Sequence, residues 1–189
     1  MIIGFAFYGK SQENETNAGF KTPILPANYV KLDLSNIGLK ATVIAPKQSE
    51  TQKSYLDDNE GGRDYYLIYT FQILTGDSNL DKRGGIWAEI EILTTTWTLK
   101  QHKDRVKYSS IAGWHQFLKE DEDYFMYSAS PANSWNQPLR AKDKDVYHFA
   151  ILKKSQQDGK QYLIRSSSSF DLTKDQMLLL YAIARSVEL

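Results

Sequence analysis

The sequence predicts one α+β domain: an antiparallel β-sheet of five to seven strands with helices packed on one face. Three observations support this prediction. Aromatic residues make up 13% of the 189 residues, and aromatic side chains favour strands. Several segments alternate apolar and polar residues with the period of a strand. The segment that begins at Leu172 instead has the capping signals and apolar spacing of an amphipathic helix.

Composition divides the chain into three parts. Residues 1–12 begin with a short apolar run that resembles the second half of a secretory signal peptide, although an N-terminal edge strand is the alternative. Residues 13–36 contain two prolines and scattered polar residues, which predict an ordered lead-in. Residues 37–189 form the predicted domain. If the first part is a truncated signal, the protein is periplasmic or secreted; otherwise it is cytoplasmic.

The first half of the predicted domain is organised as strands and loops. Alternation of side chains predicts strands at residues 38–46, 63–74 and 86–93. The polar residues 49–62, which end in two glycines, predict a loop, and residues 75–85 predict a hairpin loop.

After residue 94 the apolar period changes from that of a strand to that of a helix. The residues that carry this spacing are Ile111, Trp114, Phe117 and Leu118. We therefore expect two short helices, or one kinked helix, between residues 97 and 119, with Thr95 or Thr96 as the N-cap. The acidic run at residues 120–123 marks the exit turn.

The last third of the chain has the clearest local signals. Strands are predicted at residues 124–130, 146–154 and 160–170, with Asp158 and Gly159 forming the turn between the last two. A helix is predicted at residues 173–187, with Thr173 as N-cap and Gln176 completing a capping box. Four serines, residues 166–169, precede this helix. We interpret them as strand and connector, whose small side chains let the helix approach the sheet.

Charge and motifs exclude several classes of function. Twenty-three basic and 23 acidic residues give a formal charge of zero, so the electrostatic footprint of a nucleic-acid-binding protein is missing. No apolar run is long enough to cross a bilayer as a helix, so we expect no integral membrane segment. The chain has no cysteine and no phosphate-binding loop, and we expect no cofactor.

The histidines and serines give weak signals for catalysis or metal binding. His102, His115 and His148 are the only histidines and form no H-x-x-H pair, so we expect no metal site. No G-x-S-x-G motif accompanies the serine run, and we predict no catalytic residue. The alternative is a small hydrolase that uses His115 or His148 with a nearby acid.

The best candidate binding feature in the sequence is the loop at residues 131–145. Trp135 lies there among amide and basic side chains, which are Asn133, Asn136, Gln137 and Arg140. An indole in such surroundings stacks on a sugar or anchors a protein partner. The alternative is that Trp135 folds back and covers an edge of the sheet.

Several stretches together resemble a family of uncharacterised exported bacterial proteins of Bacteroidetes type, many of them lipoproteins. These stretches are "LKATVIAPK", "WAEIEIL", "FLKEDEDYFMYS", "VYHFAILKK" and "YLIRSSSSFDLTKDQMLLLYAIARSVE", which span about four fifths of the chain. The resemblance implies a Mog1/PsbP-like fold, an antiparallel sheet flanked by helices. A lipoprotein needs a lipobox cysteine, which this chain lacks, so the resemblance implies release as a soluble protein after export.

These observations lead to a prediction about function. We expect a non-enzymatic binding or accessory protein of the bacterial cell envelope, because Mog1/PsbP-like domains generally bind or assemble with partners and no catalytic signature is present. The expected partner is another protein, with a glycan as the second choice. The alternatives are a toxin-neutralising immunity protein, a carbohydrate-binding module and the small hydrolase named above.

Overall fold

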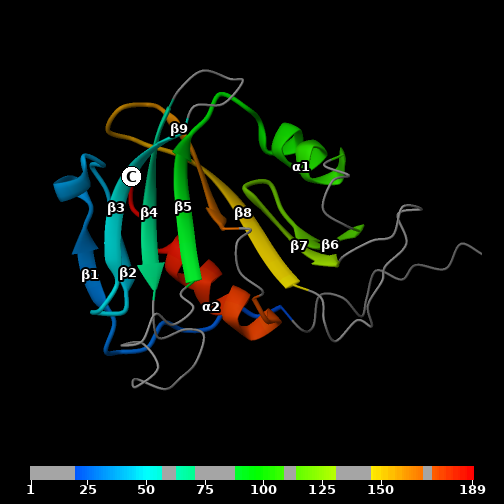
Figure 1. The fold of residues 1–189 in the computed structure, drawn as a ribbon, viewed down its shortest axis with the longest axis horizontal. Coiled ribbons are helices and arrows are strands. Elements are labelled where there is room, and N and C mark those ends of the chain that lie inside the picture. The colour runs from blue at the N-terminus through cyan, green and yellow to red at the C-terminus, as the bar shows by residue number, and fades with distance from the viewer. Residues whose placement is uncertain (1–19, 57–62, 71–87, 109–113, 131–145, 168–171) are drawn as a thin grey trace, which may run out of the picture.

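The computed structural model describes residues 20–56, 63–70, 88–108, 114–130, 146–167 and 172–189. These residues form a seven-stranded antiparallel sheet, a two-stranded sheet and two α-helices (Figure 1). The large sheet has the order β3-β4-β5-β9-β8-β7-β6. Its strands are β3 (Glu50–Leu56), β4 (Arg63–Thr70), β5 (Ala88–Thr94), β6 (Trp114–Glu120), β7 (Tyr124–Ser130), β8 (Val146–Lys154) and β9 (Gln161–Ser166). The other elements are β1 (Val30–Asp33), β2 (Thr42–Ala45), the 3-10 turn η1 (Ser35–Ile37), α1 (Leu99–Tyr108) and α2 (Lys174–Arg185).

Helix α2 begins where the sequence predicts it. The Thr173 hydroxyl accepts a hydrogen bond from the Gln176 amide at 3.3 Å, and the Gln176 side chain accepts one from the Thr173 amide at 2.8 Å. This capping box satisfies two amides that a helix start leaves without partners. The buried residues of α2 are Met177, Leu178, Leu180, Tyr181, Ala182, Ile183 and Ala184. They pack on the sheet and form the main core with it.

The two α-helices lie on opposite faces of the large sheet, so the prediction that both pack on one face is wrong. Ile92 and Ile164 belong to the core under α2, whereas their neighbours Leu93 and Leu163 belong to a second cluster that packs against α1. Successive side chains of a strand point to opposite faces. The α+β class, the antiparallel sheet and the C-terminal helix are confirmed.

The predicted helical region at residues 97–119 contains one helix and one strand. Helix α1 ends at Tyr108, and residues from Trp114 onward form β6, which pairs with β7. The pairing register shifts between Phe117 and Lys119. Phe117 packs in the α1-side cluster and Leu118 packs against the main core, as the alternation of a strand requires. Two adjacent apolar residues on opposite faces of an edge strand therefore gave the helix-like spacing.

Strand β3 occupies part of the segment predicted as a loop at residues 49–62. It pairs with β4 alone in the large sheet and is therefore an edge strand. Its polar side chains Gln52 and Lys53 are exposed. Polar and charged residues are typical of edge strands because they discourage pairing with other chains. The polar composition that predicted a loop is thus explained by the position of the strand.

The last hairpin agrees with its prediction. Strands β7 and β8 have the predicted bounds, and β9 ends at Ser166, short of the predicted residue 170. Gly159 has φ of +71°, a left-handed conformation that glycine adopts without strain. Residues 168–171, including Ser168 and Ser169, lie outside the described residues.

The lead-in contributes to the same core as the sheet. Phe20 and Leu34 are buried in the main cluster, and β1 pairs with β2. Thr42 of β2 also exchanges two backbone hydrogen bonds with Glu188, at 3.0 and 2.9 Å. The small sheet is therefore held by both ends of the described chain. No helix within the described ranges is long and apolar enough to cross a membrane.

Candidate functional site

The candidate site lies on the outer side of α1. The inner side of this helix packs on the sheet through Leu99 and Val106, which contact a cluster made by Leu93, Phe125, Ala150 and Leu163. His102 is also buried on the inner side. Because residues three, four and seven apart share one side of a helix, the opposite side presents Gln101, Asp104, Arg105 and Tyr108.

The link between β5 and α1 is fixed by hydrogen bonds. The Thr98 hydroxyl accepts a bond from the Gln101 amide at 3.3 Å, while the Gln101 side chain accepts one from the Thr98 amide at 2.8 Å. This second capping box makes Thr98 the N-cap, so the prediction of Thr95 or Thr96 is wrong. Thr95 has another role: its hydroxyl accepts a bond from the Trp97 amide at 3.1 Å and lies 3.0 Å from Nε2 of His102.

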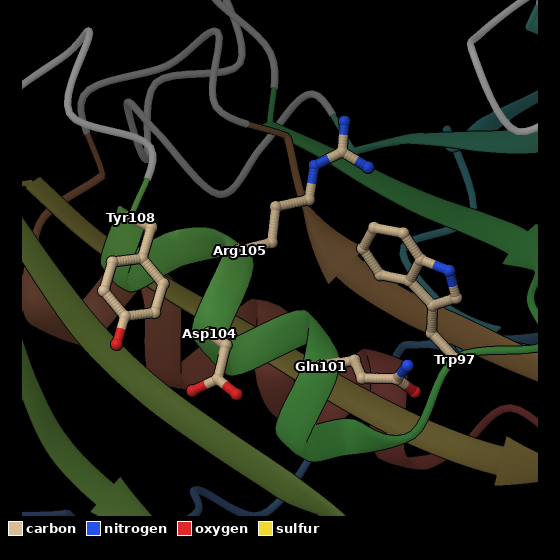
Figure 2. A pocket seen from close by; sticks show the side chains of 5 residues that line it. All are labelled: Trp97, Gln101, Asp104, Arg105 and Tyr108. Atoms are coloured by element: carbon tan, nitrogen blue, oxygen red, sulfur yellow. The ribbon is translucent and has the colours of Figure 1, made fainter.

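Trp97 and α1 together form a shallow groove with a volume of about 280 Å³. Its lining residues are Trp97, Gln101, Asp104, Arg105 and Tyr108. Figure 2 shows Trp97 and Tyr108 at the two ends of the groove, with the polar side chains between them. The Trp97 ring also lies 5.4 Å from the His102 ring, between centroids. The His102 ring therefore supports the indole, while Tyr108 is 71% exposed.

Basic side chains dominate the surface of α1. The helix carries Lys100, Lys103, Arg105 and Lys107 against a single acid, Asp104. Lys100 bonds to Asp104 at 2.6 Å, and this contact raises the pKa of the Lys100 ammonium. Lys103 forms an ion pair with Glu120. The remaining two cations lie over aromatic rings: Arg105 is 5.4 Å from the centre of the Trp97 ring, and Lys107 is 5.6 Å from that of Tyr108.

The groove thus combines two aromatic rings with Arg105, and Lys107 lies beside Tyr108. Aromatic and arginine side chains contribute most of the binding energy in protein interfaces. Cations on the rim attract acidic groups and orient them. None of these residues was predicted as a site, although the helical spacing of residues 101, 104, 105 and 108 after Trp97 is visible in the sequence.

One histidine of the hydrolase alternative, His148, lies buried against a residue of the serine run. The Ser166 hydroxyl lies 3.4 Å from Nδ1 of His148, so the serine run does place one hydroxyl against an imidazole. That hydroxyl also accepts a bond from the Phe149 amide at 3.3 Å. Both side chains are buried, and neither lines the groove beside α1. A nucleophile must reach its substrate, so this contact is best explained as part of the packing between β8 and β9.

Titratable groups continue across the α1 side of the sheet. The Tyr127 ring lies between two imidazoles, 5.0 Å from His148 and 5.8 Å from His115. Burial raises the pKa of Tyr127 to about 12 and lowers the pKa of His115. Nearby, Nε of Arg165 donates to Glu91 at 2.6 Å. The Glu91 carboxylate is therefore held in an ion pair, and the Tyr127 hydroxyl stays protonated at neutral pH.

Other predicted site residues fall outside the described ranges or show no cluster. The loop residues Trp135, Asn133, Asn136, Gln137 and Arg140 lie outside the described residues, as do residues 1–12. The described part of the chain contains no group of three His, Asp or Glu side chains that could hold a metal ion.

Comparisons of the chain with protein-family models, with curated proteins and with solved structures find no match. The fold and the groove beside α1 are therefore the observations that bear on function.

Proposed function

We propose that the protein is a binding or accessory protein that holds a protein partner on the outer side of α1. The observation that carries this proposal is the groove itself. Tyr108 is 71% exposed beside an indole and a guanidinium, on a helix whose inner side packs on the sheet. Exposed aromatic side chains grouped with arginine are the residue types that anchor partners.

The proposed partner presents acidic side chains to this groove. Helix α1 has four basic residues and one acid, and that acid is already bonded to Lys100. An acidic segment would pair with Arg105 and Lys107 while its apolar atoms pack on Trp97 and Tyr108. In this arrangement the charge pairs would select an acidic partner, and the contacts with the aromatic rings would contribute most of the affinity. A toxin neutralised by this protein is one form that such a partner takes.

We also propose that the protein acts in the bacterial envelope and has the Mog1/PsbP-like fold implied by the sequence resemblance. The fold proposal is supported by the antiparallel sheet and the C-terminal helix packed on it. The location is supported by the apolar run at residues 2–8 and the polar residues after it.

The experiment compares partners captured by wild-type protein and by three variants from the same envelope extract. Tyr108→Ala and Arg105→Gln change the groove. Tyr55→Ala is the matched control, because Tyr55 is 64% exposed on β3 at the far edge of the sheet. We expect one protein that the wild type and the control retain and that both groove variants lose. Its retention should weaken as salt is added.

Two results would contradict the proposal. The first is a partner that both groove variants retain at wild-type level. The second is a groove that binds a neutral glycan on an array through Trp97, with no acidic protein retained, since Gln101 and Asp104 beside an indole also suit a sugar.

A further inference from the structure

A second pocket lies on the opposite face of the sheet and shares no residue with the α1 groove. It has a volume of about 220 Å³ and lies where the chain after η1 meets the turn of the β8–β9 hairpin. The side chains that matter for its chemistry are Lys40, Tyr66, Ser155, Asp158, Lys160 and Tyr162. Tyr66 and Tyr162 belong to the main core, so their rings form a fixed wall.

The one carboxylate of this pocket is already engaged. One oxygen of Asp158 accepts a bond from the Lys160 amide at 3.0 Å, and the other accepts one from the Tyr162 hydroxyl at 2.9 Å. These bonds lower the pKa of Asp158, so its carboxylate stays charged. Burial and the bond to Asp158 raise the pKa of Tyr162, which keeps its hydroxyl protonated. Asp158 therefore shapes the pocket by holding the turn and the ring together.

The two ammonium groups of the pocket are in excess over its single carboxylate. Five other cations of the described structure, which are Lys31, Lys100, Lys103, Arg165 and Arg185, pair with carboxylates, whereas Lys47 and Lys154 are in none of these pairs. Lys40 and Lys160 form no such pair among the described residues. They come from segments 120 positions apart in the sequence, and the fold places both at one cavity.

We propose that this pocket binds a small organic anion, whose phosphate or carboxylate group pairs with Lys40 and Lys160. A water molecule takes about 30 Å³ in the liquid, so a cavity of about 220 Å³ suits a small molecule. The tyrosine rings provide an apolar wall for the body of the ligand. The hydroxyl of Ser155 is turned to the local backbone, where it accepts bonds from the Gln157 and Asp158 amides at 3.2 and 3.4 Å.

Binding at this place would also join two parts of the fold. Lys40 lies two residues before β2, and Lys160 lies one residue before β9. An anion held by both would link the small sheet to the last hairpin of the large sheet. Anything that binds only the folded state raises the unfolding temperature. The ligand is therefore expected to stabilise the protein.

The test uses inorganic phosphate and glucuronate as anionic probes and glucose as the neutral probe. Binding is followed by the backbone amide NMR signals of Gly38 and Gly159, which lie at the pocket and in its turn. The variants are Lys40→Gln and Lys160→Gln. The matched controls are Lys47→Gln and Lys154→Gln, which remove exposed lysines that do not line the cavity.

We expect at least one anion to shift the two glycine signals and to raise the unfolding temperature, while glucose does neither. Each pocket variant should weaken binding roughly tenfold, and the controls should change it little. The proposal is overturned if neither anion shifts these signals at concentrations on the order of ten millimolar, or if the control variants weaken binding as much as the pocket variants. The Trp97 indole signal reports the α1 groove separately, so the two proposals fail independently.

Discussion

The two faces of the large sheet differ in what covers them. Under α2, buried apolar side chains from six strands and from the lead-in form one continuous core, and seven of the twelve helix residues are buried. On the other face, α1 covers a cluster of four buried residues. The rest of that face carries charged and titratable side chains, among them Glu91, Arg165 and Tyr127.

This difference separates stability from recognition. The α2 face excludes water over a wide area and supplies most of the hydrophobic free energy of folding. The α1 face has less apolar area to offer, so its helix is held by a few contacts and two local hydrogen-bond networks. Residues on a surface that contributes little to stability can change during evolution without unfolding the protein, so such a surface can be adapted to bind a partner. Four measurements test whether the two faces are unequal in this way.

The largest expected effect is in the core under α2. Leu180 is fully buried, so Leu180→Ala should lower the free energy of unfolding by about 2–5 kcal/mol. Val106→Ala on α1 removes a half-buried side chain and should cost about 1 kcal/mol. Urea unfolding followed by far-UV circular dichroism measures both. Equal losses would show that the two faces contribute alike.

The two capping boxes should differ in the same direction. Thr173→Ala removes the cap of α2 and should lower global stability by about 1 kcal/mol. Thr98→Ala removes the equivalent cap of α1, and we expect it to speed hydrogen exchange in α1 while the unfolding midpoint changes less. Serine at each position is the conservative control. If Thr98→Ala lowers global stability more than Thr173→Ala, α1 is an integral part of the core.

The ion pair between Glu91 and Arg165 should contribute a smaller amount. Its side chains are 15% and 43% exposed, and a double-mutant cycle with Glu91→Gln and Arg165→Met should give about 0.5–1 kcal/mol of coupling. The pair of Lys31 and Glu188 is more exposed and serves as the comparison, with an expected coupling of nearly zero. A larger coupling in the exposed pair would contradict the burial argument.

The last comparison concerns alkaline pH, where one group on each face acts in opposite directions. Burial, and then the charge of Arg185, lower the pKa of Lys153 beside α2 from 10.5 to about 8. Between these values the unfolded chain binds more protons, so stability rises with pH. Burial raises the pKa of Tyr127 from 10.0 to about 12. In that range the folded state keeps a proton that the unfolded chain has lost, so stability falls with pH.

Two variants separate these contributions in unfolding experiments between pH 8 and pH 12. Lys153→Met should flatten the rise, and Tyr127→Phe should reduce the fall. Burial also raises the pKa values of Tyr162 and Tyr181, so some of the fall should remain in Tyr127→Phe. Wild-type behaviour of both variants over the whole range would contradict the assignments.

Local signals in the sequence predicted the elements whose pattern is set within a few residues. The capping box of Thr173 and Gln176 and the turn at Gly159 depend on neighbours in the chain, and both are confirmed. Strands β3 and β6 were missed because their patterns depend on position in the sheet. Strand β3 lies at an edge of the sheet, where polar residues are typical, so its sequence resembles a loop. In β6, the bulge after Phe117 breaks the alternation that identifies a strand.

The site was harder to predict than the fold. A tryptophan among amides drew attention to residues 131–145, which lie outside the described residues, so that hypothesis is untested. Trp97 lies in a link whose threonines looked like simple caps. Trp97 lines a groove only because of where α1 lies on the sheet. That position is set by contacts with Phe125 and Leu163, which are far away in the sequence. The spacing of residues in the sequence shows which side chains share one side of a helix. It does not show which side packs on the sheet.

The bond between Thr42 and Glu188 has a consequence for synthesis in the cell. Strands β1 and β2 can pair with each other early, but the backbone groups of Thr42 find their partner only when residue 188 has left the ribosome. The hairpin of β1 and β2 must therefore wait until the chain through residue 188 has been made before this contact secures it. Substitution of Glu188 by proline, which has no amide hydrogen to donate, should delay this final closure and leave the earlier steps unchanged.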